Sequence, residues 1–168
     1  AHGMTPDLLT FAKGVGNGLA LGGVVAGADL MDSLPGNSLS TFGGNPMSSV
    51  GALATIRYML KHDIQGHALA MGERLAGHLQ PAVDASSVVA ELRGKGLMLA
   101  IETVQAGSLE PNTDAASRIM EEARAAGLLI GKGGLYGNVL RIAPPMTVTE
   151  AEIDEAADVL VRIIERLG

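Results

Sequence analysis

The stretch Leu8-Leu9-Thr10-Phe11-Ala12-Lys13-Gly14-Val15-Gly16-Asn17-Gly18 places a lysine directly after an apolar run, and alternating glycines directly after the lysine. The apolar run predicts a short buried strand over residues 8–12, and residues 19–26 predict a second strand beyond the glycine turn. A solvated turn residue is the ordinary interpretation of such a lysine. A strand buried on both faces, followed by glycines without side chains, instead favours a partly desolvated amine that is open to a flat ligand. Lysines in such surroundings lose their proton more readily and form imines with carbonyls.

The glycines of this turn do not fit the common phosphate-binding motifs. Gly14-x-Gly16-x-Gly18 differs from the G-x-G-x-x-G spacing of dinucleotide-binding turns. That motif also requires a helix directly afterwards, whereas residues 19–26 predict a strand. Gly131-Lys132 is followed by glycine rather than by the Ser or Thr of a P-loop. The spacing therefore excludes both kinds of nucleotide site.

Outward from this turn, the pattern predicts helices and strands in alternation. Asn45 as N-cap and Pro46 at the first helical position predict a helix with a broad buried face through Leu60, broken near residues 62–63. Thr149 with Glu152 forms a capping box before a final amphipathic helix. The other expected elements are a helix ending at Pro81, strands over 88–92, 97–101, 128–130 and 139–142, and a helix over 113–126 closed by Gly127. This order predicts an α/β fold or mixed α+β layers, with a lobe boundary near residues 62–68.

Composition narrows the function classes. Hydrophobic residues make up 47% of the 168 residues and charged residues 18%, which favours a sizeable core and argues against disorder. The net charge of −6 with scattered Lys and Arg argues against nucleic-acid binding. With no cysteine there is no disulfide framework, and no apolar run reaches the length of a membrane span. We expect a cytoplasmic protein, and we expect the chain to be the later part of a longer one.

Two further segments are candidate binding sites. The loop Ser40-Thr41-Phe42-Gly43-Gly44-Asn45-Pro46 offers two hydroxyls and successive glycine amides ahead of a helix N-terminus, which suits a phosphate. A plain helix-capping loop is the alternative. Arg141 lies in an apolar run that ends in Pro144-Pro145, and its guanidinium cannot lose its charge. Its partner is therefore either a carboxylate of the protein or the carboxylate of a substrate.

Other polar residues carry weaker signals. His62, His67 and His78 lack the spacing of a metal pair and are expected to be solvated, so no metal site is predicted. Arg93-Gly94-Lys95-Gly96 predicts a hairpin turn rather than an anion contact.

Taken in order, four motifs resemble one family. PDLLTFAKGVGNG (6–18), STFGGNP (40–46), ELRGKGLMLAIE (91–102) and VLRIAPPMTVTEAEID (139–154) are similar to the C-terminal part of class III (ω-amino acid type) aminotransferases. The resemblance covers essentially the whole chain and is strongest to the alanine–glyoxylate branch. It implies a pyridoxal-phosphate enzyme of fold type I. Residues 1–65 would then be the end of the large cofactor-binding domain with the connecting helix, and residues 66–168 the small C-terminal α/β domain.

The resemblance also implies roles for individual residues. Lys13 matches the lysine that holds pyridoxal 5'-phosphate as an aldimine and then shuttles a proton between the substrate carbon and the cofactor. Thr41, with Ser40 beside it, matches the threonine that binds the cofactor phosphate of the neighbouring subunit, which implies a homodimer with shared active sites. Arg141 matches the arginine that holds the carboxylate of the amino acid or keto acid substrate.

Other family features are expected to lie upstream of this chain. These are the aspartate that pairs with the pyridinium nitrogen, the aromatic residue that stacks on the ring, and a second phosphate loop. We therefore expect the chain alone to bind the cofactor weakly or not at all. An aminomutase or decarboxylase on the same scaffold, and a truncated domain without catalysis, remain the alternatives.

Overall fold

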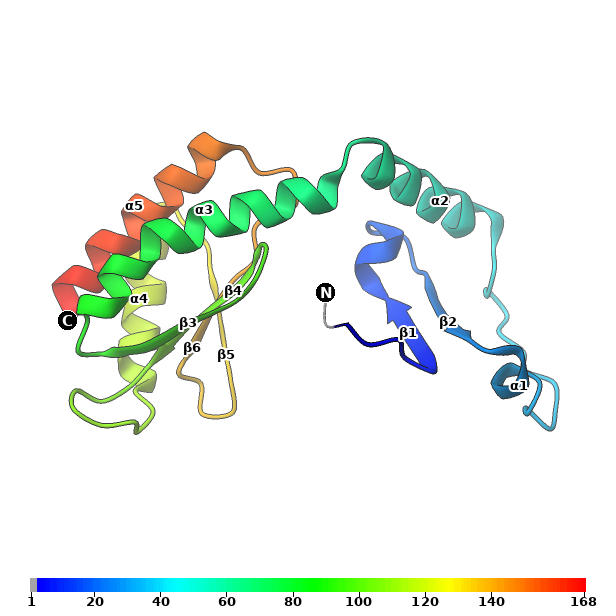
Figure 1. The fold of residues 1–168 in the computed structure, drawn as a ribbon, viewed down its shortest axis with the longest axis horizontal. Helices are drawn as coiled ribbons and strands as arrows, with labels where there is room; N and C mark the ends of the chain where they lie inside the picture. Colours follow the sequence, from blue (N-terminus) through cyan, green and yellow to red (C-terminus); the bar gives the residue numbers. More distant parts are fainter. Residues whose placement is uncertain (1–2) are drawn as a thin grey trace. The chain divides into compact units, whose positions relative to one another are not determined.

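The computed structural model describes residues 3–168, so Ala1 and His2 lie outside the described residues. The chain divides into two compact units, residues 1–63 and residues 64–168, each with its own helices and strands (Figure 1). The division falls between α2 (Pro46–Lys61) and α3 (Ile64–Ala85), where Asp63 adopts a φ of 46°. The predicted helix break near His62 and Asp63 is confirmed.

The first unit contains an antiparallel pair of strands that flanks the glycine turn. β1 (Leu8–Ala12) pairs with β2 (Gly22–Ala26), with Leu8 opposite Ala26 and Ala12 opposite Gly22. Between them the 3-10 helix η1 (Lys13–Gly16) reverses the chain. A short helix, α1 (Ala28–Met31), follows β2 and precedes the loop to α2. The prediction of β1 is confirmed, whereas the second strand begins at Gly22 rather than Leu19.

The expected burial of this unit is wrong for the chain as it stands. Leu8 and Leu9 of β1 are 49% and 52% exposed. The apolar stripe of α2 is also exposed, with Val50 at 65% and Leu60 at 72%, and the buried residues of that helix are Ser48 and Ala52. The apolar residues of β1 and α2 are typical of elements that are covered on several sides. A two-stranded sheet and one long helix cannot supply that cover by themselves.

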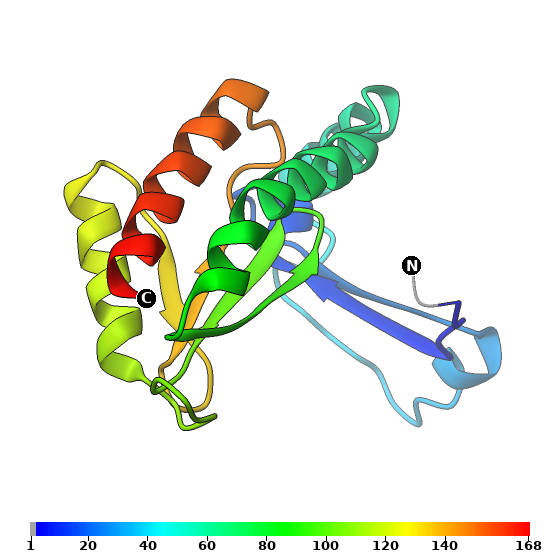
Figure 2. The same ribbon diagram turned by 60° about the vertical axis from the view of Figure 1, so that its left-hand side comes forward.

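The second unit is a four-stranded antiparallel sheet with helices packed on one face (Figures 1 and 2). The strands lie in the order β3-β4-β6-β5, and the helices α3, α4 and α5 cover them. Their bounds are β3 (Val89–Lys95), β4 (Met98–Thr103), α4 (Thr113–Ala125), β5 (Gly131–Gly133), β6 (Val139–Ile142) and α5 (Glu150–Leu167).

The core of this unit lies between the sheet and the helices. Residues opposite one another on neighbouring strands share a face, so Leu92, Ile101 and Leu140 form one row beneath the helices. Ile101 and Leu140 are fully buried, as is Leu160 of α5. The other face of the sheet carries Arg93, Ala100 and Arg141 in the adjacent row. The sheet therefore has an apolar face closed by helices and a polar face that these helices leave open.

Helix ends follow the expected capping chemistry. The Asn45 side chain accepts a hydrogen bond from the Ser48 backbone N–H at 3.0 Å, and Pro46 occupies the first turn of α2. Thr149 and Glu152 form the predicted capping box at the start of α5. Gly127, with a φ of 87°, follows the end of α4 as expected.

The hairpin between β3 and β4 turns later than predicted. Arg93 and Gly94 lie inside β3, and Lys95 pairs with Met98 across the turn. Close backbone approaches explain the shift. A Cβ on Gly94 would lie 2.0 Å from the Met98 carbonyl oxygen, and one on Gly72 of α3 would lie 2.1 Å from Gly96. The glycines therefore serve strand pairing and helix contact rather than a wide turn.

Two other predicted boundaries are wrong. The strand expected over residues 128–130 lies at Gly131–Gly133, where pairing with Val139–Arg141 fixes its register. The helix expected to stop at Pro81 continues to Ala85 with the proline inside it. Ala82 and Val83 are 5% exposed, so packing of the last turn against the core outweighs the lost backbone hydrogen bond.

Candidate active site

Lys13 stands at the junction between β1 and η1. It is the first residue of the 3-10 helix and has a φ of 57°. This left-handed backbone conformation is unusual for residues other than glycine, asparagine and aspartate. Such a conformation costs on the order of 1–3 kcal/mol, and residues held in it cluster at functional sites. The Lys13 side chain is exposed and has no hydrogen bond or ion pair with any residue in the range 3–168. Its amine is therefore open to a ligand, although the desolvation expected from a buried strand is absent here.

The glycines after Lys13 leave its surroundings clear. A Cβ on Gly14 would meet no other heavy atom within 4 Å. Gly18 has a φ of 97°, which only glycine adopts without strain, and it directs the chain toward β2. The residue after Lys13 therefore has no side chain, and the space where one would lie is empty.

The loop before α2 is a compact series of turns. The Gly43 backbone N–H donates to the Ser40 carbonyl at 3.1 Å, and the Asn45 N–H donates to the Phe42 carbonyl at 3.3 Å. Gly44 has a φ of 66°. The hydroxyls of Ser40 and Thr41 are exposed and make no hydrogen bond within the described part of the chain. The loop caps the helix through Asn45, and it leaves both hydroxyls available as donors to a phosphate.

Lys13 and this loop belong to the same unit but are not bonded to one another. Across residues 3–168, no hydrogen bond or ion pair joins Lys13 to Ser40 or Thr41. The described contacts therefore do not join the two candidate sites.

Arg141 lies in β6 on the open face of the second unit's sheet. Ala100 is its neighbour on β4 and Gly131 its neighbour on β5, so small residues flank it on both sides. A Cβ on Gly133 would lie 3.6 Å from Arg141 Cδ, which places the arginine side chain alongside β5. Arg141 is exposed, and no carboxylate among the described residues pairs with it. Of the two partners considered from sequence, a carboxylate of the protein is thus not found.

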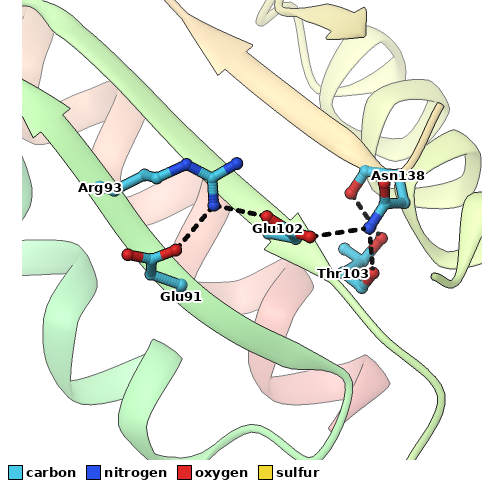
Figure 3. A network of polar contacts seen from close by, with 5 residues as sticks. All are labelled: Glu91, Arg93, Glu102, Thr103 and Asn138. Atoms are coloured by element: carbon cyan, nitrogen blue, oxygen red, sulfur yellow. Dashed lines mark hydrogen bonds and ion pairs between the residues drawn. The ribbon is translucent and has the colours of Figure 1, made fainter. Parts of the chain in front are cut away.

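Sequence reasoning missed a polar network on the same sheet face (Figure 3). Arg93 Nη1 donates to Glu102 Oε2 at 2.5 Å and to Glu91 Oε2 at 2.8 Å. The hydrogen bonds to Glu102 and then Glu91 raise the pKa of Arg93 above its usual value. The strand register was the signal, because Glu91 and Glu102 face one another once the turn is placed after Lys95.

Asn138 closes the network from the β5–β6 loop. It is 2% exposed, and its Nδ2 donates to the Thr103 carbonyl at 2.9 Å and to Glu102 Oε1 at 3.4 Å. Thr103 Oγ1 lies 2.6 Å from the Asn112 carbonyl oxygen and 3.0 Å from the Asn138 carbonyl oxygen, and its single proton serves these two acceptors. These bonds fix the end of β4 and hold one side of the Glu102 carboxylate.

The histidines and the remaining site classes add no chemistry. His67 is half-buried and its Nε2 lies 2.8 Å from the Val148 carbonyl, so it is not the solvated side chain expected. Within residues 3–168, no group of three or more acidic or histidine side chains is arranged to hold a metal ion. No helix in the described part of the chain is both long and apolar enough to cross a membrane.

Comparison with known proteins gives one consistent family. A family model, Aminotransferase class-III, matches residues 1–164. The chain is 38% identical over 156 residues to alanine–glyoxylate aminotransferase 2 homolog 2, mitochondrial, of Arabidopsis thaliana, covering 92% of this chain and 33% of that protein. The chain thus spans about a third of the length of this relative.

Two solved structures share the fold closely. A phospholyase from Arthrobacter in complex with phosphoethanolamine superposes with a TM-score of 0.92 at 31% identity, over 99% of this chain and 40% of that one. An aminotransferase from Bacillus anthracis gives a TM-score of 0.89 at 27% identity, over 98% of this chain and 40% of that one.

Proposed function

Because the chain belongs to the class III aminotransferase family, we propose that the protein containing it transfers an amino group from an amino acid to a 2-keto acid. Members of this family depend on pyridoxal phosphate and have fold type I, with the mixed α/β architecture described above. The observation that carries the proposal is Lys13, an exposed amine in a left-handed backbone position within the motif that resembles the family's cofactor lysine.

The groups present fit the cofactor's needs. Pyridoxal phosphate requires a primary amine for its aldehyde and hydrogen-bond donors for its phosphate. Lys13 supplies the amine, and Ser40 and Thr41 supply hydroxyls that have no partner in the described part of the chain. When bound, the cofactor supplies an electron sink for the carbanion formed at the substrate carbon.

The protein's own residues then divide the remaining work. Lys13 would hold the cofactor at its aldehyde carbon C4′, and as a free amine it would carry a proton between the substrate α-carbon and C4′, which the substrate nitrogen separates. Arg141 binds the substrate carboxylate through its planar guanidinium, whose two parallel N–H groups match a carboxylate. The small neighbours Ala100 and Gly131 leave room beside it.

The domain organisation and assembly follow from the same family resemblance. We propose that residues 1–65 are the end of a large cofactor-binding domain and residues 66–168 a small C-terminal domain. The exposed apolar side chains of β1 and α2 support this, because a larger domain would cover them. Thr41 would bind the cofactor phosphate of the neighbouring subunit, which makes the protein a homodimer with shared active sites.

A keto-acid requirement tests the proposed reaction. In the complete protein loaded with pyridoxal phosphate, L-alanine and glyoxylate should yield pyruvate and glycine in equal amounts. Repeated turnover should require both the amino donor and the keto-acid acceptor, since either one alone supports at most a single turnover. Lys13→Ala should abolish the reaction, and Lys95→Ala, which removes another exposed lysine, should leave it intact. Failure across a panel of amino donors with glyoxylate, pyruvate and 2-oxoglutarate would refute amino transfer.

A second reaction class has one specific observation in its favour. The Arthrobacter structure with a TM-score of 0.92 is a phospholyase, so this fold also serves a protein that is not named as a transaminase. A lyase reaction forms its product from one substrate and needs no keto acid as acceptor. The same assay, run with an amino substrate and no acceptor, therefore separates the two classes.

A further inference from the structure

Arg93 and Arg141 share the open face of the second unit's sheet. Arg93 lies opposite Ala100 on β4, and Ala100 lies opposite Arg141 on β6. The two arginines are therefore two strands apart in one row, about 10 Å at the backbone. The helices α3, α4 and α5 pack on one face of this sheet (Figure 2). By strand register, Arg93 and Arg141 belong to the opposite face.

Glu102 stands between the two arginines, one row away. It lies opposite Glu91 on one side and opposite Val139 on the other, so Arg141 is its diagonal neighbour on β6. Diagonal neighbours across an antiparallel pair are about 7–8 Å apart and remain within reach of long side chains. By position alone, the Glu102 carboxylate could therefore pair with Arg141 and neutralise it.

The network prevents that pairing. Glu102 Oε2 accepts from Arg93 at 2.5 Å, and Oε1 accepts from the buried Asn138 amide at 3.4 Å (Figure 3). Both carboxylate oxygens are thus turned toward groups other than Arg141. Within residues 3–168, Arg141 has no hydrogen-bonded or ion-paired side-chain partner.

We propose that Arg93 is a positioning residue, which holds Glu102 away from Arg141 and so keeps the Arg141 guanidinium free for a substrate carboxylate. This inference rests on the proposed function, in which Arg141 binds that carboxylate. The two glutamates also occupy Arg93, so the second arginine of the row does not compete with Arg141 for the same anion. Of the two arginines, Arg141 alone is then available to a substrate carboxylate.

A purely structural role for Arg93 makes a different prediction. Glu91 and Glu102 face one another directly, and like charges in that arrangement repel unless a cation bridges them. If Arg93 only relieved this repulsion, removing either glutamate would compensate equally for its loss. If Arg93 guards Arg141, only removal of Glu102 compensates, because Glu102 is the diagonal neighbour of Arg141 and Glu91 is not.

The experiment measures carboxylate affinity in the complete protein loaded with pyridoxal phosphate. The probe is butanoate, a monocarboxylate without an amino group, whose inhibition constant is obtained by competition with the amino donor. We expect Arg93→Met to weaken butanoate binding and raise the KM of the donor about fivefold, with kcat nearly unchanged. Adding Glu102→Gln should restore affinity to within about twofold of the unaltered protein. Adding Glu91→Gln instead should leave affinity weak.

Two further variants keep the outcomes separable. Arg141→Met should lose butanoate affinity outright; if it does not, the proposed role of Arg141 fails. If Arg141→Met loses affinity but Arg93→Met does not, or if Glu91→Gln restores affinity as well as Glu102→Gln does, the inference about Arg93 alone is refuted. Arg93→Lys, which keeps the charge but not the fork of donors, should bind butanoate with intermediate affinity, and it serves if Arg93→Met does not fold.

Discussion

The two units of this chain contain similarly apolar helices and strands, but only one of them closes a core. In residues 64–168, Ile101, Leu140 and Leu160 are fully buried between a sheet and its helices. In the first unit, Leu9 of β1 is 52% exposed and Val50 of α2 is 65% exposed. In both units, the local sequence pattern therefore determines whether a helix or strand forms. Whether its apolar face is buried depends on the elements available to cover it.

Truncating one leucine in each unit should give the largest contrast. Leu140→Ala leaves a cavity in a closed core and should lower the free energy of unfolding of the second unit by about 2–5 kcal/mol. Leu9→Ala removes a half-exposed side chain and should cost about 1 kcal/mol or less in this 168-residue chain.

Urea unfolding followed by tyrosine fluorescence separates the two units. Tyr58 lies in the first unit and Tyr136 in the second, so Tyr58→Phe and Tyr136→Phe backgrounds each report one of them. Equal losses from Leu9→Ala and Leu140→Ala would contradict the contrast, since they would mean that β1 is covered in solution.

Removing one helix cap in each unit should give a smaller effect. Thr149→Ala breaks the capping box of α5, whose apolar face is packed in the core, and should destabilise the second unit by about 1 kcal/mol. Asn45→Ala removes the cap of α2 and should leave the unfolding of the second unit unchanged. Thr149→Ser keeps the cap oxygen and is the control. A loss in the second unit's transition from Asn45→Ala would show that the units unfold together.

Acid should produce the smallest effect, again in the second unit. Hydrogen bonds from the Thr149 backbone N–H and hydroxyl lower the pKa of Glu152 below its usual 4.5, and the bond from Arg74 lowers the pKa of Asp154 below its usual 3.8. A carboxylate with a lowered folded-state pKa contributes stability above its unfolded pKa and loses it as pH falls through the folded pKa. The urea midpoint of the second unit should therefore fall as pH drops below about 4.5.

The double variant Glu152→Gln with Asp154→Asn should flatten this acid dependence. The Gln and Asn side chains do not titrate, so the midpoint between pH 5 and pH 3 should change less than in the unaltered chain. An unchanged slope would mean that other carboxylates set the acid response.

Sequence predicted the elements of this fold better than their surroundings. β1, β6 and the caps at Asn45 and Thr149 were found because apolar runs and capping residues act over a few positions. The burial of β1 and α2 was wrong because cover comes from distant parts of a protein, which a local pattern does not record. The predicted helix end at Pro81 was wrong for a related reason, since core packing outweighs the helix-breaking tendency of proline at that point.

The candidate site was predicted in part. Lys13, Ser40, Thr41 and Arg141 were chosen from motif and resemblance, and the structure gives each a side chain without a partner in the described part of the chain. The left-handed backbone of Lys13 was not foreseen, because it arises from how η1 joins the two strands. The Arg93 network was missed because one wrongly placed turn put Arg93 in a loop instead of in β3.

Lys13 is proposed to hold the cofactor, and covalent trapping identifies the amine that does so. The complete protein loaded with pyridoxal phosphate is reduced with borohydride, digested and examined by mass spectrometry. Reduction should fix the cofactor to the peptide that contains Lys13, and Lys13→Ala should remove the label. A label on Lys95 or Lys132 instead, or a protein that binds pyridoxal phosphate yet shows no label after reduction, would show that Lys13 does not hold the cofactor.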